Sequence, residues 1–351
     1  MKVLMVGPDR CVHGGISAVV NELYEAGLGE KIDLKYIGTM KEGSRFDKLL
    51  VAGCAFFRFI FALPWADVVH VHFSSDSSFI RKSYFIKAAR RHGKKIVLHQ
   101  HGGDFKNYYG KELDERGRKR VKDVLGMGDV MLVLTSSWKE FFSGITDSGK
   151  IEVFPNGIRT EGREISSEIE KDYNKILFLG RICKDKGIDE LLEAVGKIHD
   201  AHSNVRLYIG GIYEDQEFKR KIEKSGSFCE YIGWVTGKEK EEYLNKCGIL
   251  VLPSYYEGFP VSIIEAMFHN SAVIASRVGG IPDIIDDGKD GLLISPKDSG
   301  ELREAIEKLI SDKDLAKKLG INGQKKVLEK YSVEENIKRL IRIYSKLCRT
   351  D

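Results

Sequence analysis

The sequence predicts an α/β protein with two doubly wound, Rossmann-like domains, each built on a parallel sheet. Short apolar segments bounded by glycine or proline alternate with amphipathic segments of helical periodicity along nearly the whole chain. A polar, aperiodic stretch, residues 159–172, interrupts this alternation and is expected to be a linker. Because strand–helix–strand crossovers make parallel neighbours, the two series of segments indicate two domains. A chain of 351 residues is long enough to give each domain its own core.

The composition is that of an ordinary globular protein, with 42% hydrophobic and 31% charged residues. The six cysteines form no C-x-x-C pair and no metal-site spacing, which indicates reduced thiols and a cytoplasmic protein. The first residues, Met1 to Gly7, predict a strand rather than a signal peptide. No stretch is long and apolar enough to predict a membrane span.

The charge is unevenly distributed along the chain. Residues 1–158 carry 24 Lys and Arg against 18 Asp and Glu, a net charge of +6, and the remainder carries 32 against 34, a net charge of −2. A basic first half can attract an anionic surface or an anionic acceptor, and a solvated surface without a partner is the alternative. No nucleic-acid motif is present, so nucleic acid is not an expected partner.

The segment Leu49 to Leu63 is strongly apolar and is interrupted by Arg58. It is too short to span a bilayer. We expect a helix packed under the first sheet. The alternative is peripheral docking of the basic first domain at the inner face of a membrane.

The sequence Glu257-Gly-Phe-Pro-Val-Ser-Ile-Ile-Glu265 carries the strongest functional signal. An apolar strand is predicted before it over residues 248–254, and a helix is predicted after it, from the loop proline to about Asn270. A helix amino end suits a phosphate, and a carboxylate on each side of it suits hydroxyl groups. Two solvated surface glutamates are the alternative.

Two glycine loops also join a predicted strand to a predicted helix. Gly14 and Gly15 follow the first strand, a geometry that can cradle a phosphate or simply make a turn. In the second half, Gly180-Arg181 is followed by Lys186-Gly187. Arginine can bind two phosphate oxygens and lysine adds a point charge, so this loop predicts an anion site; a solvated basic loop is the alternative.

Four histidines fall on two predicted strands of the first domain. His70 and His72 lie on one face of their strand, but the sequence suggests no third metal ligand, so no metal site is predicted. His99 and His101 end the next strand before Gly102, which marks a site loop. The sequence does not decide between His99 and His101, and a histidine without function is the alternative for each.

These motifs together resemble the retaining GT-B glycosyltransferases of family 4, the "group 1" class. The glutamate pair resembles the family's glutamate-seven-glutamate motif, and Gly180 to Gly187 resembles its G-R-x(4)-K-G signature. Asp67-Val-Val-His-Val-His72, Pro155-Asn-Gly157 and Val278-Gly-Gly-Ile-Pro-Asp283 resemble other family segments, with Asp283 where glutamate is more usual. The resemblance covers nearly the whole chain.

The resemblance implies two Rossmann-like domains that face a cleft. Residues 1–158 would form the acceptor-side domain, residues 159–330 the nucleotide-sugar domain, and residues 331–351 a helix that returns to the first domain. It also implies a role for each matching residue. These expected roles are catalysis for His101 and Glu257; diphosphate binding for Arg181, Lys186, Gly14 and Gly15; backbone contacts to donor sugar and phosphate for Gly258, Phe259, Pro260 and Val261; ribose binding for Glu265; and a base region at Trp234 and Val235. We expect Trp234 to pack rather than to stack on the base.

The implied activity is transfer of a sugar from a nucleotide-diphosphate sugar to a glycan or lipid-linked acceptor in cell-surface polysaccharide assembly. The alternative is a GT-B protein that binds nucleotide sugars with other chemistry, such as epimerisation, or without turnover. No cofactor is expected, and a UDP-sugar is favoured over a GDP-sugar. No Asp-x-Asp motif stands at a predicted strand end, so side-chain cations are expected in place of a metal.

Overall fold

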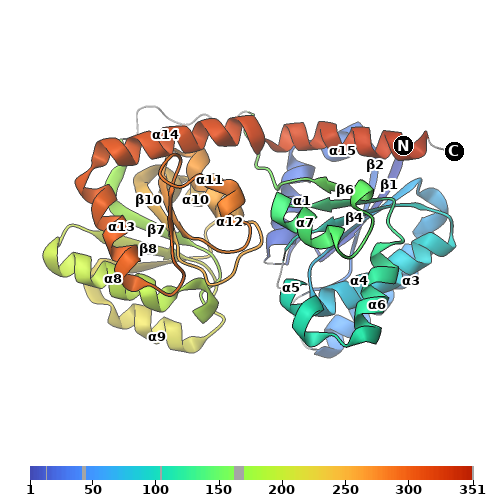
Figure 1. Cartoon of the computed structure of the whole chain (residues 1–351), viewed down its shortest axis with the longest axis horizontal. Coiled ribbons are helices and arrows are strands. Elements are labelled where there is room, and N and C mark those ends of the chain that lie inside the picture. The colour runs from blue at the N-terminus through green and yellow to red at the C-terminus, as the bar shows by residue number, and fades with distance from the viewer. Residues whose placement is uncertain (13, 42–44, 103–104, 162–169, 350–351) are drawn as a thin grey trace. The chain divides into compact units, whose positions relative to one another are not determined.

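The computed structural model divides into two compact units (Figure 1). The first unit comprises Met1–Glu161 and Ser332–Asp351, and the second comprises Gly162–Tyr331. The structure describes residues 1–12, 14–41, 45–102, 105–161 and 170–349, without the side chains of 45–49. Residues 162–169, within the predicted linker, lie outside the described residues.

The first unit is built on a six-stranded parallel sheet in the order β2-β1-β3-β4-β5-β6. Its strands are β1 (Lys2–Gly7), β2 (Asp33–Gly38), β3 (Val68–Phe73), β4 (Lys95–Gln100), β5 (Val130–Val133) and β6 (Ile151–Val153). The chain runs outward from β1 to β2, then crosses back to β3 and continues to β6. The strand order therefore reverses between β1 and β3, which is where open α/β sheets bind ligands.

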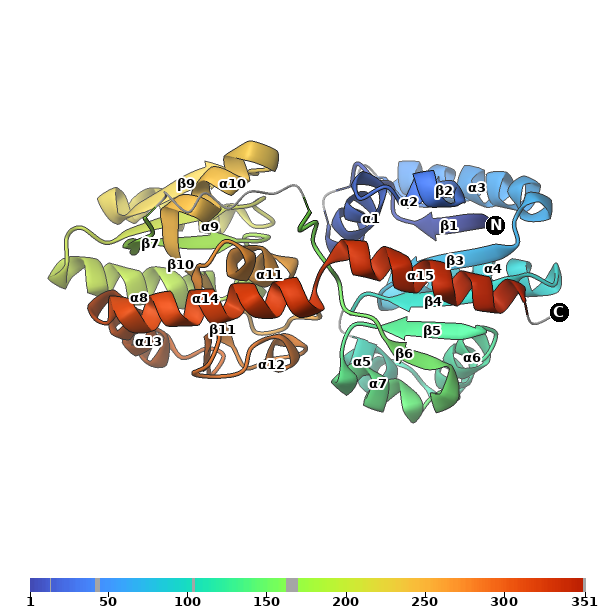
Figure 2. The ribbon, with the colours of Figure 1, turned by 90° about the horizontal axis from the view of Figure 1, so that it is seen from above.

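The helices of the first unit cover both faces of its sheet. They are α1 (Gly15–Glu25), α2 (Leu28–Lys31), α3 (Arg45–Ala62), α4 (Asp76–Arg91), α5 (Phe105–Asn107), α6 (Glu115–Leu125), α7 (Ser136–Ser143) and α15 (Val333–Cys348), with short η1 (Leu63–Trp65), η2 (Tyr108–Glu112) and η3 (Ser148–Lys150). Figure 2 shows α15 beside α1, and α15 also contacts β3. With right-handed crossovers, α3, α4, α6 and α7 cover the opposite face.

The last helix, α15, belongs to the core of the first unit. Ile337, Leu340 and Tyr344 are buried and pack in one cluster with Val3 and Met5 of β1. The core of this unit therefore joins the two ends of the described chain.

The second unit repeats the architecture with the strand order β12-β11-β10-β7-β8-β9. Its strands are β7 (Asp172–Leu179), β8 (Arg206–Gly210), β9 (Cys229–Gly233), β10 (Cys247–Leu252), β11 (Ala272–Ser276) and β12 (Leu292–Ile294). Its helices are α8 (Ile188–Ala201), α9 (Gln216–Lys224), α10 (Gly237–Lys246), α11 (Val261–Phe268), α12 (Ile281–Ile284), α13 (Ser299–Ser311) and α14 (Lys313–Lys330), with short η4 (Lys184–Lys186) and η5 (Gly226–Phe228). Here the order reverses between β7 and β10. The predicted fold class, two doubly wound α/β domains, is confirmed.

The apolar segment predicted at residues 49–63 is a helix, α3, that packs through one side only. Ala55 and Phe59 of α3 and Leu63 of the adjoining η1 are buried, whereas Phe57 and Phe61 are 70% and 83% exposed. The prediction of a packed helix is therefore correct for the inner face and wrong for the outer face. Among the described helices, none has the length and apolar content required to cross a bilayer.

Candidate active site

Loops that follow three strands of the second unit converge at the carboxyl edge of its sheet. The loops after β7 and β10 meet because these strands are neighbours, and the backbone N–H of Tyr255 donates to the carbonyl of Asp185 at 2.8 Å. The loop after β11 joins them through the N–H of Gly280, which donates to the carbonyl of Glu257 at 3.3 Å. Lys186 and Glu257, 71 residues apart in the sequence, are thereby brought together.

Glu257 lies in the centre of this convergence and is only 8% exposed. Its carboxylate accepts a hydrogen bond from the Ser254 hydroxyl at 2.8 Å and forms an ion pair with the Lys186 ammonium, which comes from η4. Both side chains of the ion pair are largely removed from water, so neither charge is solvated independently of the other. The pair places cationic and anionic hydrogen-bonding atoms side by side.

Two glycines make this close approach of the loops possible. Gly187 and Gly279 have positive φ angles, +69° and +53°. A Cβ atom at Gly187 would lie 2.1 Å from the carbonyl oxygen of Pro253, and one at Gly279 would lie 1.7 Å from that of Glu257. Any other residue would displace the backbone that carries Glu257.

The second glutamate of the motif, Glu265, lies on α11 and is also 8% exposed. Its carboxylate accepts a hydrogen bond from the Lys240 ammonium at 2.6 Å. Lys240 comes from α10, and sequence reasoning missed it because nothing in its spacing relates it to Glu265. Each glutamate of the motif is thus held by one lysine.

The helix that joins the two glutamates begins at Val261, so Pro260 stands just before the helix and not within it. No side chain caps this helix end, whose first N–H groups have no intrahelical acceptor. The helix ends at Phe268, two residues earlier than predicted. The Phe259 ring is buried against Tyr331, edge to face with centroids 5.8 Å apart, so the loop presents backbone rather than that ring.

Arg181 follows β7 and lies at the exposed side of the site. Its guanidinium forms an ion pair with Glu214 at 2.7 Å, and both side chains are about half exposed. Burial opposes the charged form, but the carboxylates of Glu214 and, less strongly, Glu257 outweigh it and raise the pKa of Arg181. The arginine predicted to bind diphosphate is thus close enough to Glu257 to be influenced by its charge.

The predicted base region lies at the end of β9. Val235 is buried, whereas Trp234 is 45% exposed. The prediction that Trp234 packs is therefore met only in part, because nearly half of its side chain is exposed. The physical reason is that β9 is an edge strand, so no further strand covers the residues at its outer side.

In the first unit, strand pairing assembles the four histidines. Register places His72 of β3 directly opposite His99 of β4. The rings of His70 and His72 stack with centroids 4.3 Å apart, and those of His99 and His101 lie 4.1 Å apart. His72 Nδ1 is 2.7 Å from His101 Nε2, and His70 Nε2 is 3.2 Å from His99 Nδ1. We call these four residues the histidine cluster.

The histidine cluster is uncharged at neutral pH. Burial, and then the neighbouring imidazole of His101, lowers the pKa of His70 to about 3, and burial lowers that of His101 to about 3. Burial also lowers the pKa values of His72 and His99 well below the usual value. His99 is fully buried whereas His101 is partly exposed, which favours His101 as the ring that meets a ligand.

The fold supplies the third histidine that the sequence did not suggest for a metal site. One nitrogen from each of His70, His72 and His99 lies within 4.8 Å of the others. Two Zn–N bonds span at most about 4.2 Å, and the near-parallel rings of His70 and His72, 11° apart, do not direct their lone pairs at one point. As arranged, the cluster is a hydrogen-bonded stack, and the absence of a metal stays a prediction.

The glycine loop of the first unit has free space beside both of its glycines. Gly14 precedes α1 and Gly15 begins it, and a Cβ atom at either position would meet no atom within 4 Å. Packing therefore does not require glycine here. Diphosphate binding by Gly14 and Gly15 stays a prediction.

Sequence reasoning also missed Lys82, a lysine of α4 that is only 1% exposed. Its ammonium donates to the Thr39 hydroxyl, which in turn donates to the carbonyl of Gly7 at the end of β1. Burial, with a contribution from Arg81, lowers the pKa of Lys82 well below its usual value. The basic sequence of this helix predicts a solvated face and gives no signal for a buried lysine.

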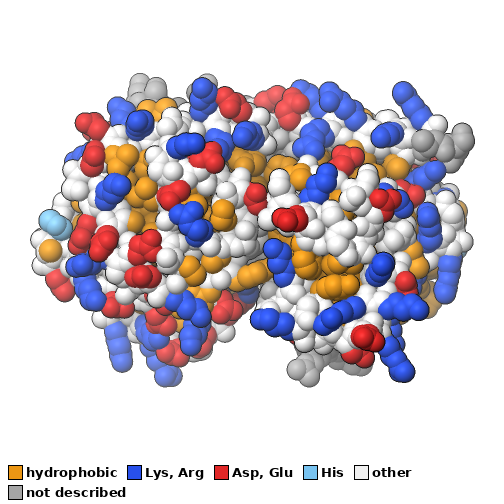
Figure 3. All heavy atoms as spheres, viewed as in Figure 1, with side chains coloured by type: hydrophobic (Ala, Val, Ile, Leu, Met, Phe, Trp, Pro, Cys, Tyr) orange, Lys and Arg blue, Asp and Glu red, His pale blue; other side chains and the backbone are white. Residues whose placement is uncertain are grey.

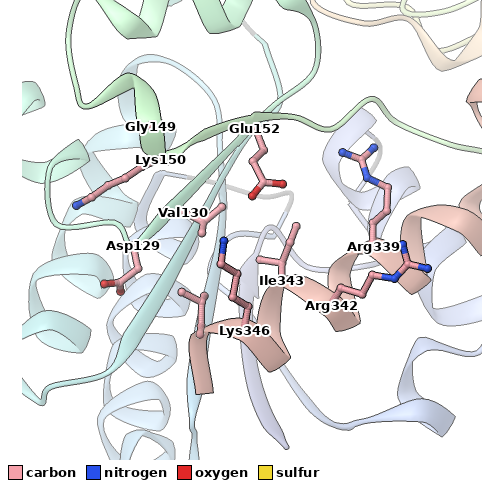
Figure 4. Close-up of a pocket in the computed structure, with 10 residues that line it drawn as sticks. Asp129, Val130, Gly149, Lys150, Glu152, Arg339, Arg342, Ile343 and Lys346 are labelled. Atoms are coloured by element: carbon pink, nitrogen blue, oxygen red, sulfur yellow. The ribbon is translucent and has the colours of Figure 1, made fainter. Parts of the chain in front are cut away.

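A cavity of about 440 Å³ lies at the opposite, amino edge of the first sheet (Figure 4). It is lined by Asp129, Val130, Gly149, Lys150, Glu152, Arg339, Arg342, Ile343, Lys346 and Leu347. Asp129 and Lys150 immediately precede β5 and β6, whereas the predicted site residues of this unit lie at or beyond the carboxyl ends of strands. The cavity therefore does not coincide with the candidate site.

Two sequence families match the chain in succession. The family described as "Glycosyltransferase Family 4" matches residues 35–161, and "Glycosyl transferases group 1" matches residues 161–326. The chain thus matches two glycosyltransferase families, one after the other. The group 1 match contains Arg181, Lys186, Glu257 and Glu265, and the family 4 match contains the histidine cluster.

The chain is similar to several glycosyltransferases of bacteria and archaea. It is 35% identical over 178 residues to an uncharacterized glycosyltransferase of Methanocaldococcus jannaschii, covering 51% of this chain and 50% of the relative. It is 31% identical over 207 residues to the capsular polysaccharide biosynthesis glycosyltransferase CapM of Staphylococcus aureus, covering 54% of each. The putative teichuronic acid biosynthesis glycosyltransferase TuaC of Bacillus subtilis is 28% identical over 304 residues, 82% of this chain and 72% of the relative. The chain thus spans about half the length of the first of these relatives.

Solved structures confirm the GT-B fold. A sucrose-phosphate synthase from Thermosynechococcus elongatus superposes with a TM-score of 0.81 at 20% identity over 100% of both chains. HepE from Anabaena in complex with UDP superposes with a TM-score of 0.77 at 14% identity, covering 99% of this chain and 100% of that one.

Proposed function

We propose that this protein is a retaining glycosyltransferase that moves a sugar from a nucleotide-diphosphate sugar to a glycan or lipid-linked acceptor in cell-surface polysaccharide assembly. The observation that carries the proposal is the Lys186–Glu257 pair, buried where the strand order of the group 1 domain reverses, with Arg181 beside it. The names of CapM and TuaC support polysaccharide assembly, and HepE in complex with UDP supports UDP as the nucleotide.

In the proposed reaction the bond between the anomeric carbon and the diphosphate breaks, and negative charge develops on the leaving diphosphate. The ammonium of Lys186 has three N–H donors, so it can bond phosphate oxygens while it still donates to Glu257. Arg181 adds a bidentate cation, and the uncapped amino end of α11 adds backbone donors. These groups stabilise charge that is greatest in the transition state, which is how they would accelerate the reaction.

The two glutamates are proposed to bind hydroxyl groups rather than to act as acid and nucleophile. Glu257 is oriented by Ser254 and Lys186, and its carboxylate can accept from a hydroxyl of the donor sugar. Glu265 is oriented by Lys240 and can accept from the ribose hydroxyls. Gly258 to Val261 would contribute backbone contacts, and Trp234 and Val235 would border the base.

His101 is proposed to contact the transferred sugar as a neutral imidazole. Its Nε2 already faces His72, and its Nδ1 is buried without a hydrogen-bond partner, so a sugar hydroxyl can bond Nδ1 only if donor binding opens a path to it. Side-chain cations are proposed to take the place of a metal at the diphosphate. Retention of the anomeric configuration is part of the proposal, without a choice between mechanisms.

The first test is thermal unfolding in the presence of UDP-, GDP- and ADP-sugars, with Arg181→Ala and Glu265→Ala measured in parallel. A ligand at about 100 times its dissociation constant stabilises the fold by about 2.7 kcal/mol. We expect stabilisation by a UDP-sugar that is lost in both variants.

Product analysis separates the proposal from its alternative. A stabilising donor that yields a glycoside with unchanged anomeric configuration supports a retaining transferase. Binding followed by conversion of the donor to another nucleotide sugar, or by no turnover, would show a GT-B protein with other chemistry. An inverted product would contradict retention alone.

A further inference from the structure

The outer side of α3 carries an exposed apolar stripe. Leu50, Cys54, Phe57 and Phe61 recur at intervals of four, three and four residues, so they lie on one face of the helix. Leu50 is 53% exposed, Phe57 70% and Phe61 83%, and Cys54 is exposed as well. Single exposed apolar residues are ordinary, but an aligned series with two phenylalanines marks an interaction surface.

The neighbouring helix α4 extends this surface. Ile80 and Tyr84, one helical turn apart, are 52% and 61% exposed. The two helices pack side by side through their inner faces, where the rings of Phe56 and Phe59 meet Phe85 edge to face at 5.4 and 5.0 Å. Because both helices cover the same face of the sheet, their outer faces point away from it on the same side. We call Leu50, Cys54, Phe57, Phe61, Ile80 and Tyr84 the α3/α4 apolar face.

Basic residues border the α3/α4 apolar face. Arg58 is exposed on α3 itself, and Arg90 and Arg91 are exposed at the end of α4. The next helix, α6, contacts α4 and exposes Arg116, Arg118, Lys119, Arg120 and Lys122 against only Glu115 and Asp123. In Figure 3, Lys and Arg side chains are spread widely over the visible face of the first unit, which includes α6.

We propose that the α3/α4 apolar face and its basic border dock on an anionic lipid bilayer, with the helices lying in the plane of the interface. Apolar side chains of such a helix enter the headgroup and acyl boundary, while neighbouring Lys and Arg meet anionic headgroups. A second copy of this chain fits less well, because pairing these faces would bring two basic first halves, each with a net charge of +6, together.

Bilayer docking is independent of sugar transfer. It uses side chains that contribute to neither the histidine cluster nor the Glu257 site, and it needs no nucleotide sugar. Its test therefore contains no donor, and its result does not depend on whether the chain is a transferase.

The test is co-sedimentation of the full chain with vesicles of phosphatidylcholine, with and without phosphatidylglycerol. We expect the protein to pellet with the vesicles that contain phosphatidylglycerol and to remain in solution with phosphatidylcholine alone. Raising the salt from about 0.1 to about 1 M shortens the Debye length from about 10 to about 3 Å, so binding should fall.

The apolar contribution is tested with Phe57→Ser/Phe61→Ser, for which we expect vesicle binding to weaken roughly tenfold or more. The matched control is Ile321→Ser/Leu328→Ser on α14 of the second unit, where the two side chains are 50% and 51% exposed. This control should bind as the unchanged protein does.

The basic contribution is tested with Arg116→Gln/Arg120→Gln, which should reduce the preference for phosphatidylglycerol. Its control, Lys317→Gln/Lys318→Gln, removes two exposed charges from α14 and should leave the preference unchanged. Each test variant and its control must have the same circular dichroism spectrum and melting temperature. A folding defect is then not mistaken for a loss of vesicle binding.

Three outcomes would overturn the proposal. The first is no binding of the unchanged protein to vesicles with phosphatidylglycerol. The second is equal losses in the test and control variants. The third is a dimer in sedimentation velocity that Phe57→Ser/Phe61→Ser dissociates, which would assign the face to a second copy of the chain.

Discussion

The two units place polar groups at the same edge of the same kind of sheet, yet they handle charge in opposite ways. The first unit gathers four imidazoles whose burial keeps them neutral. The second unit pairs each of its two motif glutamates with a lysine, Glu257 with Lys186 and Glu265 with Lys240. The fold thus places functional residues at the same edge of both sheets, while burial keeps the histidines neutral and a lysine accompanies each glutamate.

This contrast suits different ligand chemistry. Paired charges can be shared with an anion, because Lys186 keeps donors beyond the one that Glu257 accepts. A stack of neutral rings offers hydrogen bonds without attracting or repelling charge. The two sites should therefore be disrupted in different ways. The Glu257 site should be disrupted by loss of one charged partner, and the histidine cluster by protonation of its rings.

The largest effect is expected for Lys186→Met. Removing this cation leaves the buried Glu257 carboxylate uncompensated, which should lower the free energy of unfolding by about 3 kcal/mol or more. With the role proposed for Lys186 at the diphosphate, its loss should also lower transfer by about 100-fold or more. Urea unfolding and turnover with the donor found in the thermal screen measure the two effects.

The control for this variant is Arg277→Gln. It breaks the Arg277–Asp287 pair, which has a short N–O distance of 2.7 Å but is about half exposed. Such a pair contributes at most about 1 kcal/mol, so stability should change little. Equal losses in Lys186→Met and Arg277→Gln would show that burial of the Lys186–Glu257 pair has no energetic consequence.

The next effect is acid sensitivity from the histidine cluster. His70 and His101 have pKa values of about 3 in the folded state and about 6.5 when unfolded, so below pH 6.5 only the unfolded chain takes up these protons. Their stabilising contribution is complete above pH 6.5 and is lost as the pH falls toward 3, by up to about 1.4 kcal/mol per pH unit for each histidine. The melting temperature should therefore fall clearly between pH 7.5 and 5.5.

Two variants assign this pH dependence to the cluster. His99→Phe keeps an aromatic ring in the stack but removes one titrating group, so the melting temperature should depend less on pH. His202→Gln removes an exposed histidine of the second unit and should leave the dependence as it is. A melting temperature that stays constant between pH 7.5 and 5.5 would refute the assignment of neutral, buried rings.

The smallest effect on stability, and a specific one on binding, is expected for Arg181→Gln. Its ion pair with Glu214 is exposed, so the free energy of unfolding should change by less than about 1 kcal/mol. Loss of charge-assisted hydrogen bonds should weaken UDP binding by about 10- to 100-fold in calorimetry. Arg220→Gln, on α9, removes another exposed arginine as the control, and comparable weakening there would indicate a general charge effect.

The sequence predicted the fold class because alternating strand and helix patterns are local properties of the chain. The resemblance to the GT-B glycosyltransferases also brought Lys186 and Glu257 under one hypothesis, but their ion pair depends on β7 and β10 being neighbours. The meeting of His72 with His99 likewise depends on strand register. The apolar composition of α3 was evident, but composition does not say which face a helix buries.

Other features could not be read from the chain because they arise from tertiary packing. Lys240 meets Glu265 only through the placement of α10 beside α11, and Lys82 is buried although its helix is strongly basic. Exposure of Trp234 follows from the edge position of β9, which local sequence does not specify.

The packing of α15 into the first unit has a consequence for biosynthesis. A ribosome completes the second unit before it reaches Ser332, whereas Val3 and Met5 of the first unit still lack Ile337, Leu340 and Tyr344. The unit that is translated first is therefore the last to close its core. During that interval the emerging first half displays unpaired apolar surface, which is the state that chaperones recognise and that aggregation exploits.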